Sequence, residues 1–98
     1  IIGKDFMFSK GVHVTTTDSH SIMSVESGQR TNMAEDIEIQ NHVWLGYSVN
    51  INKGVTIEEN SVVAGHSVVT KSVPSNSIVA GLPAKIVKTG ITWSRTRV

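Results

Sequence analysis

The chain has 98 residues and a mass of 10.6 kDa, which allows a single domain with a modest core and excludes two domains within this stretch. It has no cysteine, which excludes disulfides, thiolate metal sites and a cysteine nucleophile. The net charge is +1, and no apolar run approaches the roughly 18 residues of a membrane span, so we expect a soluble, cytoplasmic protein that binds neither nucleic acid nor membrane.

Residues 2–19 begin with large apolar residues spaced six apart, and small or polar residues lie midway between them. A period of six fits neither the 3.6 spacing of an amphipathic helix nor the alternation of a long strand. It predicts very short strands separated by a turn every six residues. The apolar column is Ile2, Phe8 and Val14, and the turn positions are Asp5, Gly11 and Thr17.

Residues 21–36 interrupt the period, because they are polar and contain no apolar column. The columns on either side are out of phase by one residue, so this segment must leave the repeat as an excursion. Long loops within compact domains are usually functional. His20 stands directly before the excursion, where the next column residue would otherwise point inward.

Residues 39–74 carry the longest run of the period. A chain that turns every six residues and keeps one column inside winds as a solenoid of parallel strands, with coils about 4.8 Å apart. This pattern predicts an all-β parallel β-helix. The column is Ile39, Leu45, Ile51, Ile57, Val63 and Val69; its inward partners are Val43, Val49, Val55, Ser61, Ser67 and Val73; its turn positions are His42, Ser48, Gly54, Asn60, His66 and Ser72.

The column ends after Pro74, and we expect residues 75–98 to close the solenoid with a turn, one short apolar strand and a tail. The predicted organisation is a single β-helix domain over 1–98, with coils at 2–19 and 39–74. The tail region 71–98 contains no acidic residue, whereas residues 1–70 contain all 8, so an anionic partner is expected near the C-terminal end. The basic residues there are Lys71, Lys85, Lys88, Arg95 and Arg97.

Several motifs resemble the hexapeptide-repeat acyltransferase family. These are the runs Val43-Trp44-Leu45-Gly46, Val68-Val69-Thr70-Lys71 and Val79-Ala80-Gly81-Leu82-Pro83-Ala84-Lys85, and the Asp18-Ser19-His20-Ser21 segment before the excursion. That segment, together with Gly28-Gln29-Arg30 and the tail 91–95, is most similar to bacterial O-acetyltransferases of surface polysaccharides. The resemblance implies a left-handed coil of three hexads, a homotrimer, acetyl-CoA as acyl donor, a carbohydrate acceptor and no metal. Three coils are few for this family, so the chain is expected to be the C-terminal part of a longer enzyme.

The resemblance implies catalysis by His20 as general base, since an imidazole titrates near neutral pH and can accept a hydroxyl proton. Asp18 is a weaker candidate to orient the ring, because its phase points it into the coil. Trp44 either borders the acceptor or packs between subunits.

The resemblance also implies a groove for acetyl-CoA. Lysine suits the CoA phosphates as a point charge, and a backbone N–H near Gly46 or Tyr47 would stabilise the oxyanion. Tyr47 and His66 stand where many relatives carry smaller residues. The expected cofactor-binding residues are Gly46, Tyr47, Gly65, Thr70, Lys71, Pro83, Lys85 and Lys88.

Two other classes of function remain open from the sequence. One is a zinc enzyme of the β-helix carbonic anhydrase type, which would use three of His13, His20, His42 and His66. Since His42 and His66 fall on different sides of a three-hexad coil, they would not share one ion within a chain. The other is an inert trimerising module.

Overall fold

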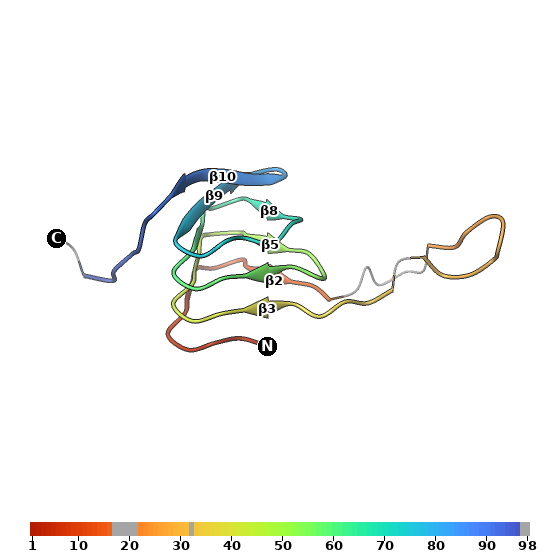
Figure 1. Cartoon of the computed structure of the whole chain (residues 1–98), viewed down its shortest axis with the longest axis horizontal. Helices are drawn as coiled ribbons and strands as arrows, with labels where there is room; N and C mark the ends of the chain where they lie inside the picture. The colour runs from red at the N-terminus through yellow and green to blue at the C-terminus, as the bar shows by residue number, and fades with distance from the viewer. Residues whose placement is uncertain (17–21, 32, 97–98) are drawn as a thin grey trace.

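The computed structural model describes residues 1–16, 22–31 and 33–96. Very short strands are stacked into a solenoid, from which one segment projects sideways (Figure 1). No helix in these described ranges could cross a membrane. The strands are Met7–Phe8 (β1), His13–Val14 (β2), Glu38–Ile39 (β3), Trp44–Leu45 (β4), Asn50–Ile51 (β5), Thr56–Ile57 (β6), Val62–Val63 (β7), Val68–Val69 (β8), Ser77–Gly81 (β9) and Ala84–Thr89 (β10).

The strands form three sheets, one for each side of the coil, in the orders β1-β4-β7-β9-β10, β2-β5-β8 and β3-β6. Neighbouring coils pair in parallel, and the predicted column residues lie in register. Leu45 is opposite Val63 and Ile51 is opposite Val69. The period of six therefore predicted the parallel β-helix correctly, because each hexad supplies one strand and one corner.

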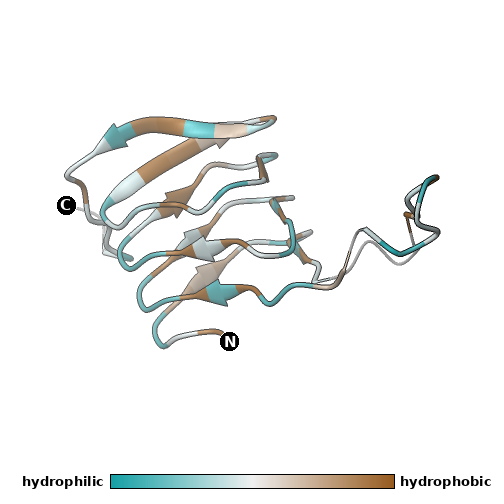
Figure 2. Ribbon diagram, turned by 45° about the vertical axis from the view of Figure 1, so that its right-hand side comes forward, coloured by the Kyte–Doolittle hydropathy of each residue, from teal (hydrophilic) through white to brown (hydrophobic). Residues whose placement is uncertain are grey.

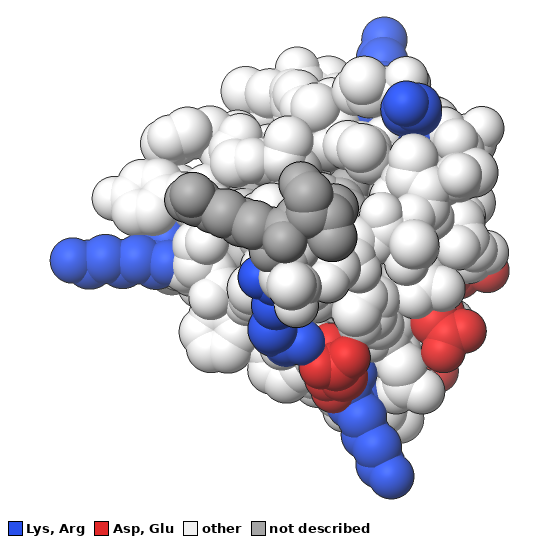
Figure 3. Space-filling model, turned by 90° about the vertical axis from the view of Figure 1, so that its left-hand side faces the viewer, with Lys and Arg blue, Asp and Glu red and all other residues white. Residues whose placement is uncertain are grey.

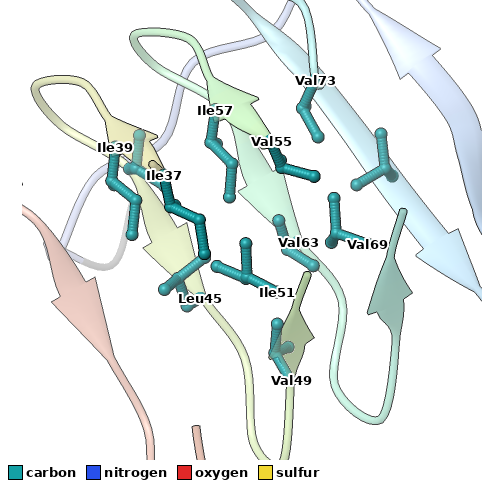
Figure 4. Close-up of a cluster of buried hydrophobic side chains, with 12 residues drawn as sticks. Ile37, Ile39, Leu45, Val49, Ile51, Val55, Ile57, Val63, Val69 and Val73 are labelled. Carbon is teal, nitrogen blue, oxygen red and sulfur yellow. The ribbon is translucent and has the colours of Figure 1, made fainter. Parts of the chain in front are cut away.

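The core lies inside the coils and consists of the predicted column and partners from 39–73, together with Ile37 and Val79, which were not predicted. Its side chains point toward one another from all three sheets (Figure 4). Hydrophobic residues lie mostly on the strands, and hydrophilic ones mostly at the corners (Figure 2). Two partner positions hold buried serines, Ser61 and Ser67, whose hydroxyls bond the Glu58 carbonyl and the Gly81 N–H.

The predicted turn positions adopt left-handed backbone geometry at Asp5, Gly11, His42, Ser48, Gly54, Asn60 and His66. Ser72 is different: its hydroxyl accepts a hydrogen bond from the Thr56 N–H, and its φ is not positive. The reason is a shortened corner, since Val73 pairs with the column residue Ile57 only four residues after Val69. Val73 thus fills a column place, and its expected role as a partner residue was wrong. Thr17 lies outside the described residues.

The closing segment contains two strands rather than the single one expected. β9 continues the stack by pairing in parallel with β7, and β10 returns antiparallel to β9. Val79 on β9 is buried in the core, in register with Val63. The hairpin therefore covers one end of the solenoid.

The first coil lies at the other end of the part of the solenoid that this chain forms. Ile2, Phe8 and Val14 pair with Ile39, Leu45 and Ile51 as the columns predict. Within this chain the first coil contacts a coil on one side, and Phe8 in its column is 61% exposed. Together with Phe6 and Val12 these residues line an apolar cavity of about 260 Å³.

Candidate functional site

The expected catalytic residue His20 and its neighbour Asp18 lie outside the described residues. The described base of the excursion packs against the corner between β5 and β6. The Lys53 ammonium donates to the Met33 carbonyl at 2.9 Å, and a side chain at Gly54 would collide with the Glu35 carboxylate. The excursion therefore returns to the solenoid beside this corner. Its described tip, 22–31, is a turn joined by a bridge between Met23 and Arg30.

Three of the expected cofactor-binding residues meet at one corner, which leads from β4 to β5 and from β7 to β8. Gly46 and Gly65 lie against each other: a Cβ on Gly46 would be 2.6 Å from the Gly65 nitrogen. The half-exposed Tyr47 ring contacts the His66 ring edge-on at 5.4 Å between centroids. At this corner two coils therefore pack backbone against backbone, beside an aromatic pair.

The Gly46 N–H does not fit the oxyanion role that the sequence suggested for it. It donates to the Val63 carbonyl at 2.9 Å, in the ladder that joins the two coils. A donor already used within the solenoid cannot stabilise a developing oxyanion without breaking that ladder. The oxyanion donor expected near Gly46 or Tyr47 is therefore not the Gly46 N–H itself.

The other expected cofactor-binding residues gather near the β9–β10 hairpin, at the corner that follows β8. Lys71 and Lys85 line one pocket of about 260 Å³. Thr70 precedes Lys71 and is exposed, and Pro83 is exposed at the tip of the hairpin. Lys88 is farther along β10 and is not among the residues that line the pocket. Two of the three expected phosphate-binding lysines are therefore brought together.

The two groups of expected cofactor-binding residues flank the sheet β2-β5-β8, because one corner precedes β5 and β8 and the other follows them. The outward residues of this sheet, in register, are His13, Asn50 and Val68. The sequence pointed to Val68 as part of a family motif and as an outward residue, but it did not point to Asn50. The period of six already indicated that both side chains face outward. Only the register of the sheet shows that they lie between the two groups of expected cofactor-binding residues.

Trp44 lies on the adjoining sheet β1-β4-β7-β9-β10 and is 36% exposed. It contacts the ring of Trp93 from the C-terminal tail, at 5.9 Å between centroids. Trp93 is buried, with 8% of its surface exposed, and stacks on His42 at 3.9 Å and 12°. The sequence showed Trp93 only as part of a tail motif and gave no sign of these contacts.

A charged cluster joins this tail to the first two coils. The Asp5 carboxylate lies 2.7 Å from His42 Nδ1 and 2.5 Å from Arg95 Nη1. Hydrogen bonds from His42 and Arg95 lower the pKa of Asp5, and the hydrogen bonds to Asp5 and the Trp93 carbonyl raise the pKa of His42. Basic and acidic side chains are in contact on the side of the molecule that carries the tail (Figure 3). Arg95 therefore serves an internal ion pair and is not an unpaired charge for an anionic ligand.

Of the histidines that the sequence offered for zinc, His13 lies on strand β2, His42 and His66 lie on separate corners, and His20 lies outside the described residues. His42 is beside Asp5 on one corner, and His66 is beside Tyr47 on another. Within residues 1–16, 22–31 and 33–96, no three His, Cys, Asp or Glu side chains gather closely enough to hold a metal ion.

Comparison with known proteins gives close relatives over almost the whole chain. A polysialic acid O-acetyltransferase of Neisseria meningitidis is 50% identical over 95 residues, which cover 96% of this chain and 44% of the relative. A polysialic acid O-acetyltransferase of Escherichia coli O1:K1 is 45% identical over 95 residues, which cover 97% of this chain and 31% of the relative. The structure of the polysialic acid O-acetyltransferase OatWY matches with a TM-score of 0.95 and 49% identity, over 99% of this chain and 46% of that one. The chain belongs to the hexapeptide-repeat acyltransferase family.

These hexapeptide-repeat relatives confirm the resemblance to O-acetyltransferases of surface polysaccharides. Their solenoids are left-handed, and a TM-score of 0.95 requires the same hand here, as the resemblance implied. The chain spans between 31% and 46% of the length of these three relatives. No family model matches the chain. A hexapeptide-repeat acetyltransferase of Vibrio cholerae, solved with acetyl coenzyme A, is 28% identical with a TM-score of 0.63, over 90% of this chain and 58% of that one.

Proposed function

We propose that this chain is part of an acetyl-CoA-dependent O-acetyltransferase that acts on a surface polysaccharide or a sugar precursor of one. The observation that carries the proposal is the match to OatWY, which extends over the corners, the hairpin and the tail that form the candidate site. The family member solved with acetyl coenzyme A supports the choice of donor.

In this proposal the donor lies along the sheet β2-β5-β8. Its phosphates bind at the pocket lined by Lys71 and Lys85, which carry the positive charge that this end requires. Its thioester end reaches the Gly46–Gly65 corner, where the two coils pack backbone against backbone. Near the hairpin the donor is bordered by Thr70, Pro83 and Lys88. At its thioester end it is bordered by Tyr47.

His20 acts as the general base in the proposed mechanism. It accepts the proton of an acceptor hydroxyl while the hydroxyl oxygen bonds to the acetyl carbonyl carbon, and it returns the proton to the CoA sulfur as the thioester bond breaks. Direct transfer of this kind needs no covalent enzyme intermediate, which suits a chain without cysteine. Trp44, on the adjoining sheet, provides an apolar face for the sugar ring.

Replacing His20 tests the proposal. A positioned general base contributes roughly 10²–10⁴-fold, so His20→Ala should reduce acetyl transfer by at least about a hundredfold while leaving CoA affinity unchanged. His20→Asn should lose as much, because an amide cannot accept the proton. In the parent, kcat/KM should fall as pH drops through the imidazole range, and both variants should lack this dependence.

Mass spectrometry of acetylated products over a panel of glycans, with polysialic acid among them, measures the transfer. Activity retained in His20→Ala would place the base elsewhere. If the parent transfers acetyl groups to no acceptor in the panel, the inert trimerising module becomes the better explanation.

A further inference from the structure

The C-terminal tail runs along one corner of the solenoid and bonds to several coils. Ile91 and Asn76 exchange two hydrogen bonds of 3.0 Å at the last coil. The Trp93 indole N–H donates to the His42 carbonyl at 2.8 Å on the second coil. Arg95 reaches the first coil, where it bonds Asp5 and the Phe6 carbonyl. Asp5, His42 and Asn76 all have left-handed φ, so the tail follows a single line of corner residues.

The His42 ring closes this arrangement, because both of its nitrogens face acceptors. Nδ1 lies 2.7 Å from the Asp5 carboxylate, and Nε2 lies 2.9 Å from the Trp93 carbonyl. A neutral imidazole has one N–H and could satisfy only one of these acceptors. Only the imidazolium, which carries an N–H on each nitrogen, can donate to both the first coil and the tail.

The tail also forms one wall around Trp44. Trp93 lies between His42, on which it stacks, and Trp44, which it contacts at an interplanar angle of 49°. Arg95 extends over the Trp93 ring at 5.2 Å from its centroid. Trp93 is thus held by His42 and Arg95, and it limits where the Trp44 ring can lie.

We propose that the tail residues 91–96 act as a latch, closed by the doubly protonated His42 between Asp5 and Trp93, that positions Trp44. Trp93 is a positioning residue in this arrangement, and His42 holds the latch closed by its hydrogen bonds to Asp5 and to the Trp93 carbonyl. The link to catalysis rests on the proposed function, in which Trp44 lies at the acceptor site. The latch itself does not depend on that assignment.

The latch should be sensitive to pH. The charged groups that face His42 are Asp5 from the first coil and Arg95 from the tail. The pKa of His42 is raised, so its contribution is complete below the ordinary value of 6.5 and is lost as pH rises through the raised pKa. The pKa of Asp5 is lowered, so its contribution is present above 3.8 and is lost as pH falls through the lowered pKa. Both side chains are therefore charged, and the latch is closed, at pH values between the lowered pKa of Asp5 and the raised pKa of His42.

The spectrum of the indole N–H groups tests the latch directly, because the chain has two tryptophans, Trp44 and Trp93. His42→Asn keeps a residue that tolerates left-handed φ but cannot carry the charge. It should shift both indole signals in a ¹H–¹⁵N spectrum at pH 6 and increase quenching of tryptophan fluorescence by acrylamide. His66→Asn is the matched control: it has a similar φ and contacts Tyr47, and it should leave both signals in place.

In the parent, the Trp93 signal should titrate with a midpoint above 6.5 and approach its position in His42→Asn at high pH. Asp5→Asn should lower that midpoint. If the Trp44 signal and the quenching are the same in parent, His42→Asn and Trp93→Ala, the latch does not position Trp44 and the inference is wrong.

Kinetics then connect the latch with the acceptor. Trp93→Ala should raise the KM for the acceptor by about 5- to 20-fold, with kcat and the KM for acetyl-CoA within about twofold of the parent. Trp93→Phe, which keeps the stack on His42, should recover most of the loss. If Trp93→Ala instead lowers kcat by about 5- to 20-fold and leaves the acceptor KM unchanged, Trp93 does not act by positioning Trp44 for the acceptor. If Trp44→Phe itself leaves the acceptor KM unchanged, the acceptor assignment in the proposed function falls, and the indole spectra alone decide the latch.

Discussion

Single residues at the corners set how closely neighbouring coils can approach. Gly46 shows this best, because its N–H bonds the next coil and a Cβ would meet backbone atoms of Gly65 and Val63 at 2.6 and 3.0 Å. Backbone atoms cannot rotate away as a side chain can, so a methyl group here must push the two coils apart. Gly65 is in a milder situation, since its Cβ would lie 3.3 Å from the Tyr47 carbonyl oxygen.

Gly46→Ala should therefore lower the free energy of unfolding by about 1–3 kcal/mol, the usual effect of inserting a methyl group where packing has no space. Gly65→Ala, one coil away at the same corner, should cost less than about 1 kcal/mol. Urea unfolding of the two variants and the parent measures the difference. Equal destabilisation by both would mean that the coils adjust freely at this corner.

Among the elements, the β9–β10 hairpin has the clearest link to binding. It brings Lys85 over the corner that carries Lys71, although the two residues belong to different strands and turns. The Ser67 hydroxyl, which accepts the Gly81 N–H at 3.1 Å, ties the hairpin to the coil beneath. The lysine pair therefore depends on the hairpin remaining docked.

The variant Lys71→Ala/Lys85→Ala should bind CoA more weakly by roughly tenfold to thirtyfold, since each partly exposed contact contributes about 1 kcal/mol or less. Adding Lys88→Ala should bring the total loss to about a hundredfold at most. The control Lys4→Ala/Lys10→Ala removes the same charge from the first coil and should leave affinity nearly unchanged. Calorimetry at two salt concentrations measures this, and the parent's affinity should fall with salt. If the triple variant binds CoA with unchanged affinity, the three lysines are solvated surface residues that do not contact the CoA phosphates.

The whole molecule presents apolar and aromatic side chains on its outer faces. Trp44 and Tyr47 are exposed, and Val62 and Val68 are partly exposed. A surface of this kind on a small solenoid favours association with further copies, and closed cyclic symmetry is the usual result.

We therefore expect the protein to be a homotrimer, with the proposed donor site bordered by a neighbouring subunit. Light scattering coupled to size-exclusion chromatography should give three times the mass of the chain at micromolar concentration. Replacing Val62 and Val68 by Lys should shift the protein toward monomer, and the buried core should keep each coil folded. A parent that is monomeric under these conditions would contradict the trimer and an inter-subunit site.

The sequence by itself determined the coils of this protein. A period of six leaves one arrangement in which Ile39, Leu45 and Ile51 all face inward, so the strands and corners follow from the spacing. The number of hexads in one coil, and with it the register between coils, was expected only from the family resemblance. The period failed at Ser72, where the corner is two residues shorter, because hydrogen bonding to Thr56 and pairing of Val73 with Ile57 outweigh the local period.

Only the tertiary structure decided how the closing segment and the tail are used. Trp93 bonds His42 across 51 residues, and Arg95 bonds Asp5 across 90. Neither pair shares a period or a motif, because the tail leaves the repeat and meets the corners from outside. Asp5 and His42 appear in the sequence as turn residues. They form a hydrogen-bonded ion pair only because the winding stacks one corner on the next, and the tail bonds to both of them from outside.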